Sequence, residues 1–149
     1  MIPIFARVVS ALPFTLLAAC AVIPAPDSTP PAPQGSAVAL NQRVRVGDLA
    51  VTPLAVVEDS RCPINARCVW AGRLVVRTQI DGAAAAGTWR DTANIQLGES
   101  YGTHGRVIAL TSGEPGKMAG RETQPEDYRF TYEPREATGG AASSTAPRS

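Results

Sequence analysis

The chain of 149 residues is long enough for one domain, and its charge is nearly balanced, with 14 Lys and Arg against 13 Asp and Glu. No run of five or more like charges occurs, so we expect no nucleic-acid partner. The positive charge is mostly arginine scattered along the chain. This pattern is typical of the solvated face of a sheet, and a binding patch on that face is the alternative.

Residues 1–19 have the pattern of a signal peptide. A start with one positive charge, Arg7, precedes an uncharged and mainly apolar stretch of twelve residues, Val8–Ala19. A membrane span needs about 20 apolar residues, so this stretch is too short to cross a bilayer but suits the core of a signal peptide. Small residues then lead to Cys20.

The string Leu17-Ala18-Ala19-Cys20 resembles the lipobox of bacterial lipoproteins. The resemblance implies that a peptidase cuts before Cys20 and that its thiol receives a diacylglyceryl group, so membrane lipid is the expected partner. A secretory signal without lipid and an uncleaved anchor are the alternatives. Position 21 is Ala, not the Asp that resembles an inner-membrane retention signal. For a Gram-negative source we therefore expect the cell envelope, on the outer membrane rather than the inner.

Residues 20–41 are expected to form a linker, because five prolines fall between Ile23 and Ser36. Such a composition favours extended polyproline conformation and buries no core. Small residues predict that the C-terminal end, 135–149, is a disordered tail. The folded domain is therefore expected at residues 42–134.

Alternating apolar and polar residues predict strands in this domain. The clearest alternation runs from Cys68 to Ile80 and places Trp70 and Leu74 on one apolar face. Other strands are expected at 43–46, 49–58, 89–97, 106–111 and 128–132. Pro53 within the second of these indicates an edge strand or a bulge. Six to seven short strands separated by turns predict an all-β fold, either a small antiparallel β-sandwich or a partly open barrel, with Trp70 and Trp89 in its core.

Cys62 and Cys68 remain once Cys20 is assigned to lipid. In an exported protein we expect them to be bonded to each other, and because the ring between them is short, the bond adds about 2–2.5 kcal/mol of stability. A redox pair, a metal site and a disulfide-braced protease-inhibitor loop presenting Arg61 or Arg67 are the alternatives. Five residues separate the cysteines, which does not match a C-x-x-C redox motif, and only His104 would add a nitrogen ligand.

Residues 58–72 match every fixed position of the pattern E-D-S-R-C-P-x4-C-x-W-A-G. They resemble a motif of small bacterial lipoproteins and secreted proteins of uncharacterised function, and this resemblance implies no activity or cofactor. We interpret the motif as architecture, in which Trp70 packs inward and Gly72 allows a close approach or a bulge. Arg61 either pairs with Glu58 or Asp59 or presents its guanidinium to an anionic ligand.

Catalytic chemistry is not expected, and neither is a metal or other cofactor. His104 is the single histidine and lies in a glycine-bounded loop, and no nucleophile-elbow glycines surround Ser60. We therefore predict a membrane-tethered binding module with an envelope protein or a glycan as partner. The candidate binding residues are Arg61, Arg67, Trp89, Tyr101 and His104. An envelope hydrolase using His104 and a protease inhibitor are the alternative functions.

The tether and the bridge are tested by the intact mass of the protein purified from its native membrane. We expect a chain that starts at Cys20, is heavier by its acyl groups, and gains about two mass units when thiols are reduced. A mass matching uncleaved Met1–Ser149, or free thiols at Cys62 and Cys68, would contradict this prediction.

Overall fold

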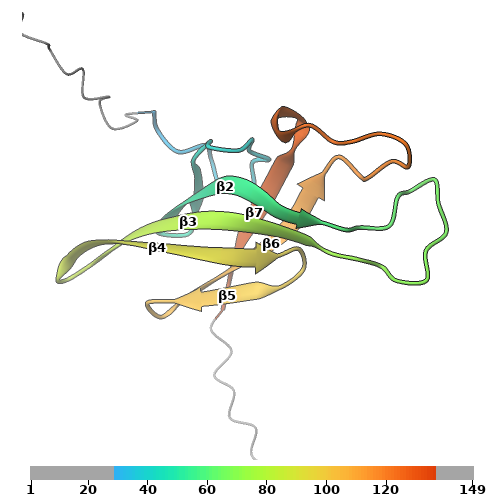
Figure 1. Ribbon diagram of the computed structural model, residues 1–149. Helices are drawn as coiled ribbons and strands as arrows, with labels where there is room; N and C mark the ends of the chain where they lie inside the picture. Colours follow the sequence, from blue (N-terminus) through green and yellow to red (C-terminus); the bar gives the residue numbers. More distant parts are fainter. Residues whose placement is uncertain (1–28, 137–149) are drawn as a thin grey trace, which may run out of the picture.

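The computed structural model describes residues 29–136 (Figure 1). The expected leader, the lipidation residue Cys20 and residues 137–149 of the expected tail lie outside the described residues. Within the described part of the chain, no helix is long and apolar enough to cross a membrane.

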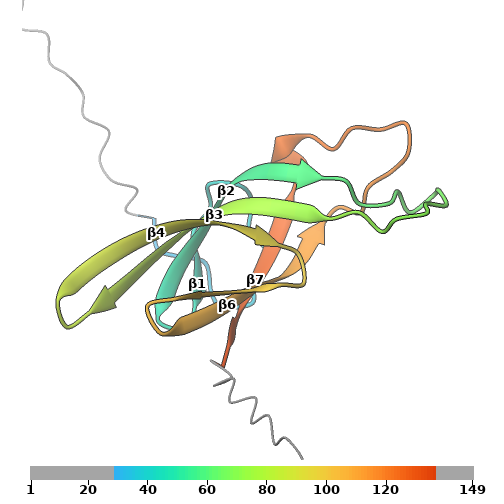
Figure 2. The ribbon, with the colours of Figure 1, turned by 60° about the horizontal axis from the view of Figure 1, so that its bottom comes forward.

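Among residues 29–136, seven strands form two antiparallel sheets, which confirms the predicted all-β fold. The first sheet has the order β1-β2-β3-β4, and its strands are Val44–Val46, Leu49–Asp59, Leu74–Ala84 and Gly87–Gln96. The second has the order β5-β6-β7, with strands Ser100–Thr103, Arg106–Glu114 and Arg129–Arg135, and a short 3-10 turn, Pro125–Asp127, precedes β7. The two sheets pack as a sandwich and do not close into a barrel (Figure 2).

The core lies between the two sheets and follows from the alternation of side chains. On β3, Leu74, Val76 and Ile80 are fully buried, whereas Arg77 between them is exposed. Phe130 and Tyr132 of β7 are the largest fully buried side chains. The Tyr132 hydroxyl lies 2.8 Å from Thr78 Oγ1, so these two buried polar groups satisfy each other across the sandwich. Burial raises the pKa of Tyr132, which keeps this hydroxyl protonated at neutral pH.

The segment before β1 closes one open side of the sandwich. Ala32 pairs with Arg43 and Arg45 next to the first sheet, with backbone bonds of 2.8 and 2.9 Å. Six residues later, Val38 exchanges two bonds of 2.9 Å with Phe130 in the second sheet and is fully buried. The prediction of a linker up to residue 41 was therefore wrong for this part of it. Prolines in an extended segment are compatible with isolated bridges, and the apolar Val38 anchors it.

Trp70 was expected in the core, and this was wrong: its side chain is 83% exposed. The alternation that includes Trp70 does not continue into β3, because Gly72 has a φ of 65° and turns the chain out of the sheet. The strand therefore begins at Leu74 rather than at Cys68. A glycine in the left-handed conformation interrupts the alternation of side chains, so the pattern before it does not continue into the strand after it.

Two further differences concern strand boundaries. Pro53 lies in an interior strand, and the bulge alternative holds because the register of β2 against β3 shifts between Pro53 and Ala55. Its carbonyl accepts a 2.7 Å bond from the Asn41 N–H, so the backbone of Pro53 faces away from β3 and no ladder donor is missed. The glycine-bounded segment around His104 was expected to be a loop, but the residues just before His104 form β5. The short and polar Ser-Tyr-Gly-Thr sequence of β5 carries little strand signal.

Packing between the sheets predicts the effect of one methyl group at Gly113. A Cβ on this residue of β6 would clash with the fully buried Leu74, so Gly113→Ala should lower the free energy of unfolding by about 1–3 kcal/mol. Gly102→Ala in β5 is the matched control, since its Cβ would meet nothing closer than 3.9 Å. Urea unfolding of both variants checks this, and equal stabilities would contradict the packing described.

Candidate functional site

Two backbone hydrogen bonds close the base of the loop that joins β2 to β3. We name this loop, residues 60–73, the Cys loop. The Ser60 N–H donates to the Arg73 carbonyl at 2.8 Å, and the Cys62 N–H donates to the Ala71 carbonyl at 3.0 Å. Any side chain at Gly72 would collide with the Ser60 carbonyl, so only glycine fits there. The predicted disulfide between Cys62 and Cys68 is present, with a Cα–Cα distance of 5.8 Å.

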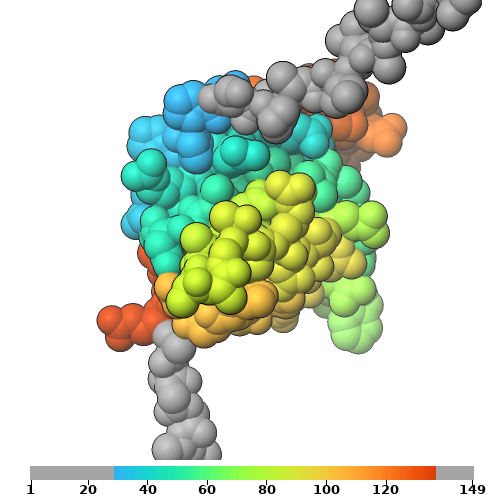
Figure 3. Space-filling view, turned by 90° about the vertical axis from the view of Figure 1, so that its left-hand side faces the viewer, coloured from blue at the N-terminus to red at the C-terminus, as the bar shows by residue number. Residues whose placement is uncertain are grey.

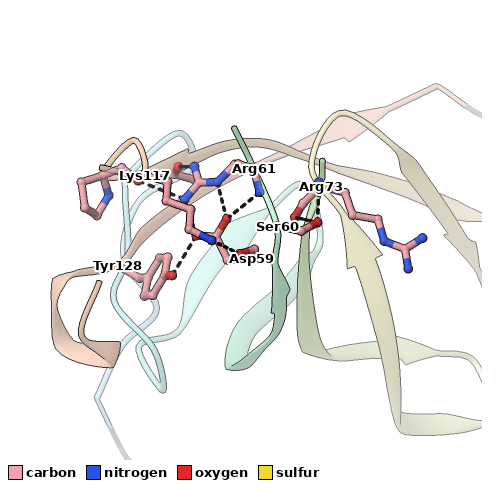
Figure 4. A network of polar contacts seen from close by, with 8 residues as sticks. Asp59, Ser60, Arg61, Arg73, Lys117 and Tyr128 are labelled. Carbon is pink, nitrogen blue, oxygen red and sulfur yellow. Dashed lines mark hydrogen bonds and ion pairs between the residues drawn. The ribbon is translucent and has the colours of Figure 1, made fainter. Parts of the chain in front are cut away.

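Asp59, the last residue of β2, organises a polar network beneath this loop (Figure 4). Its carboxylate accepts bonds of 2.8 Å from both Nε and Nη2 of Arg61 and one of 2.9 Å from the Tyr128 hydroxyl. The Arg61 guanidinium also donates to the carbonyls of Gly113 and Pro115. Its donors are therefore engaged within the fold. This geometry fits the pairing alternative for Arg61 and does not fit presentation to an anionic ligand.

The pKa values in this network follow from its geometry. Burial alone would raise the pKa of Asp59, but the hydrogen bonds from Arg61 and Tyr128 and the guanidinium charge outweigh it, so the net shift is downward. The hydrogen bond to Asp59 raises the pKa of Arg61, whereas burial and then the carboxylate raise that of Tyr128. The carboxylate is therefore charged, and its two partners protonated, at neutral pH.

A second loop is fastened beside the Cys loop. The Ile64 N–H donates to the Lys117 carbonyl at 2.9 Å, and the Asn65 side-chain oxygen accepts from the Ala119 N–H at 2.8 Å. Lys117 Nζ also donates to the Asp59 carbonyl at 2.7 Å. Residues 115–119 and the Cys loop therefore form one end of the molecule, at the right of Figure 1.

This end exposes large apolar side chains. We name as the tip four residues whose exposed fractions are 74%, 90%, 83% and 41%: Ile64, Val69, Trp70 and Met118. Clustered exposed apolar groups on a soluble domain mark contact surfaces, whereas single ones are common. Trp70 was not predicted as a binding residue. It precedes Leu74 by an even number of residues, so the alternation placed both on the apolar face and predicted that Trp70 is buried. Arg67, a predicted binding residue in the same loop, is exposed and has no ion-pair partner among residues 29–136.

The other three predicted binding residues lie together where the edges of β4 and β5 meet. The His104 ring stacks on Trp89 with centroids 3.9 Å apart, and the indole lies over Gly82. The Tyr101 hydroxyl donates to Asp91 at 3.0 Å, as does Thr103 Oγ1 at 2.8 Å. These bonds lower the pKa of Asp91, the Thr103 bond most. The group joins two sheet edges through side chains, so its aromatic rings contact the protein itself.

Ser60, Asp59 and the single histidine, His104, do not come together as a Ser-His-Asp triad. Ser60 bonds to Arg73 just before β3, whereas His104 stacks on Trp89, which pairs with Gly82 near the far end of that strand. Nine residues of strand separate these points by about 30 Å. Among residues 29–136 no three His, Cys, Asp or Glu side chains gather as metal ligands.

No protein-family model matches the chain, and no match was found among curated proteins or solved structures.

The Asp59 network generates a prediction about acid stability. The pKa of Asp59 is below the value of about 3.9 for an unfolded aspartate, so its stabilisation is present above about pH 4 and is lost as pH falls toward the folded pKa. Asp59→Asn should lower the free energy of unfolding by about 2–3 kcal/mol at pH 7, less than for a fully buried pair since the Arg61 side chain is 15% exposed. Its stability should also fall less between pH 7 and pH 3 than that of the wild type.

Glu58→Gln is the matched control for this change. Glu58 pairs with Arg73 at 2.8 Å, but both side chains are substantially exposed, so its loss should have little effect. Urea unfolding at pH 7 and pH 3 measures all three proteins. Similar losses at residues 58 and 59 would show that Asp59 does not organise the loop.

Proposed function

We propose that this protein is a lipid-anchored binding module of the bacterial cell envelope that holds a protein partner through the tip. One observation carries the proposal: Trp70 is 83% exposed on a loop whose backbone is fixed by the disulfide and by the Asp59 network. The side chains of Asp59, Ser60, Arg61 and Cys62 bond within the protein, whereas the Trp70 side chain projects into solvent.

A fixed and exposed tryptophan suits a protein interface. Tryptophan is among the residues that contribute most when protein surfaces bind, and it does so at the centre of an apolar cluster with a polar rim. The tip has this composition: Val69 precedes Trp70 in the chain, Ile64 lies in the same loop, and the exposed Glu58–Arg73 pair stands at the base of that loop. Because the loop is already held in shape, little conformational entropy is lost on binding.

Charge favours a protein partner over an anionic bilayer. The two loops with their flanks, residues 58–73 and 114–127, contain five Lys and Arg side chains and six Asp and Glu side chains. A surface that binds anionic lipid headgroups needs an excess of cations, and this end has none. The proposed contact is therefore apolar and specific in shape rather than electrostatic.

The proposed address is supported by the leader pattern and by the bridge. Lipid on Cys20 would hold the protein in the cell envelope, on the outer membrane for a Gram-negative source, with membrane lipid as the partner of the anchor. Disulfides form and persist in oxidising compartments such as the periplasm, and the Cys62–Cys68 bridge agrees with export.

A protease inhibitor is the second candidate function, favoured by the exposure of Arg67 inside the disulfide ring. The backbone inside the disulfide ring forms a turn rather than an extended segment, because the Ala66 N–H donates to the Pro63 carbonyl at 3.0 Å. Incubation with trypsin-like proteases at micromolar concentration distinguishes the two functions. The binding module leaves the protease active at every concentration.

The interface is tested by photo-cross-linking in cells that produce the full chain. A photoreactive residue at position 70 should yield one discrete adduct, and the same residue at Ala85, on the β3–β4 turn at the far end of the sheet, should not. The partner identified in the adduct is then purified. Trp70→Ala should weaken its binding by at least tenfold while leaving the melting temperature unchanged, because the indole is exposed.

Three results would refute this interface. The first is an adduct with the mass of two copies of this chain, which assigns the tip to self-association. The second is cross-linking of position 70 to lipid alone. The third is a Trp70→Ala variant that binds the purified partner as the wild type does.

A further inference from the structure

The outer face of the first sheet carries a charged groove at the opposite end from the tip. Its register aligns Arg45, Ala50, Asp81 and Arg90 in one row across β1, β2, β3 and β4. Side chains of a row share one face, and the neighbours Val44, Val46 and Val51 point into the core, so this row points outward. Arg43, two residues before Arg45, lies on the same outward face.

The groove has a volume of about 690 Å³, and its lining includes Pro31, Arg43, Arg45, Asp48, Asp81 and Arg90. A second hollow of about 490 Å³ adjoins it, shares Arg43, and is lined by Thr29, Pro30 and Ala32. The backbone bonds of Ala32 to Arg43 and Arg45 hold this proline-rich wall in place. Figure 3 faces this end, with the β3–β4 hairpin in yellow-green beside the blue-green residues of β1 and β2.

The charges of the groove leave two arginines uncompensated. Asp81 pairs with Arg90, and Asp48 pairs with Arg106 at 2.6 Å, so both carboxylates of the groove are engaged. Neither Arg43 nor Arg45 has an ion-pair partner in the part of the chain that the structure describes. Two residues on one side of an extended chain are about 7 Å apart, which lets two guanidiniums approach one carboxylate or phosphate group.

The adjoining hollow is lined by the amide side chains of Asn41, Gln42 and Gln79. Amide groups both donate and accept hydrogen bonds, so they suit a ligand that itself carries several hydroxyls. Thr52 also lines this hollow, but its Oγ1 is buried without a hydrogen-bond partner among residues 29–136 and has no surface open to a ligand.

We propose that this groove binds an acidic saccharide, whose carboxylate or phosphate is held by Arg43 and Arg45 and whose hydroxyls bond to the amides of the adjoining hollow. The groove shares no residue with the tip, so a failure of the proposed protein interface would not affect the proposed saccharide site, and the reverse also holds.

Calorimetric titration of the full chain in detergent micelles tests the proposal. The probes are a uronic-acid tetrasaccharide, its carboxyl-reduced neutral counterpart, glucose 1-phosphate and inorganic phosphate. We expect at least one of the two acidic sugars to bind more tightly than the neutral sugar and inorganic phosphate, with an affinity that falls as salt rises. Which acidic sugar binds identifies the anionic group.

Three variants make the test specific. Arg43→Gln with Arg45→Gln should weaken binding at least tenfold and remove most of the salt dependence. Thr52→Val, of nearly the same shape, should raise the melting temperature and leave binding unchanged, because it removes a buried hydroxyl that lacks a partner and does not face the ligand. Arg77→Gln, an exposed arginine of the same face outside the groove, should bind as the wild type does.

Several outcomes would overturn the assignment. They are no binding of either acidic sugar, equal binding of the neutral counterpart, equal binding of inorganic phosphate, and wild-type affinity in the double arginine variant. The arginine variants replace side chains on an outward face, so a melting temperature near that of the wild type confirms that each is folded. Thr52→Val is folded if its melting temperature is at or above that of the wild type.

Discussion

The carboxylate of Asp59 is the point on which the shape of one end of the protein depends. It joins the end of β2 to Arg61 in the Cys loop and to Tyr128 beside β7, and its backbone carbonyl accepts from Lys117. A carboxylate so far removed from water is costly to bury, and paired guanidinium and hydroxyl donors offset that cost. The disulfide closes a ring of only a few residues, whereas Asp59 fixes how that ring stands against the sandwich.

The sandwich has two unlike ways of closing its sides. On one side, Ala32 and Val38 connect the two sheets by backbone bonds. On the other, the Asp91 carboxylate accepts side-chain bonds from Tyr101 and Thr103 across the gap between β4 and β5. Both devices cover strand edges that would otherwise offer unpaired backbone groups to another chain.

Much of this fold could be predicted from the sequence, because period-two alternation is a local signal. The alternation predicted β3 from Leu74 onward and the last strand around Phe130. The expectation that the protein is exported predicted the disulfide between Cys62 and Cys68. What it missed depends on contacts distant in the sequence. A proline-rich segment gives no sign that Val38 will pair with Phe130, and no alternation rule shows that Gly72 turns Trp70 outward.

The candidate site was predicted in part for the same reason. Pairing of Arg61 with Asp59 was one of two alternatives, and both residues are close in the chain. Trp89 and His104 were both candidate binding residues, and Trp89 was also expected in the core. Their stacking joins two hairpins, and only coordinates reveal it. Arg43 and Arg45 share a groove with Asp81 and Arg90 because four strands align, which composition alone does not show.

The bridging of Ala32 has a mechanical consequence under the proposed anchor at Cys20, which would transmit load through the N-terminal end. Tension arriving along the chain reaches the bonds of Ala32 with Arg43 and Arg45 first, and the Val38–Phe130 pair only after those have parted. The proline-rich wall of the groove would therefore peel away under load while the two sheets stay together. Because the order of residues sets the order of rupture, this wall would detach before the core is disturbed.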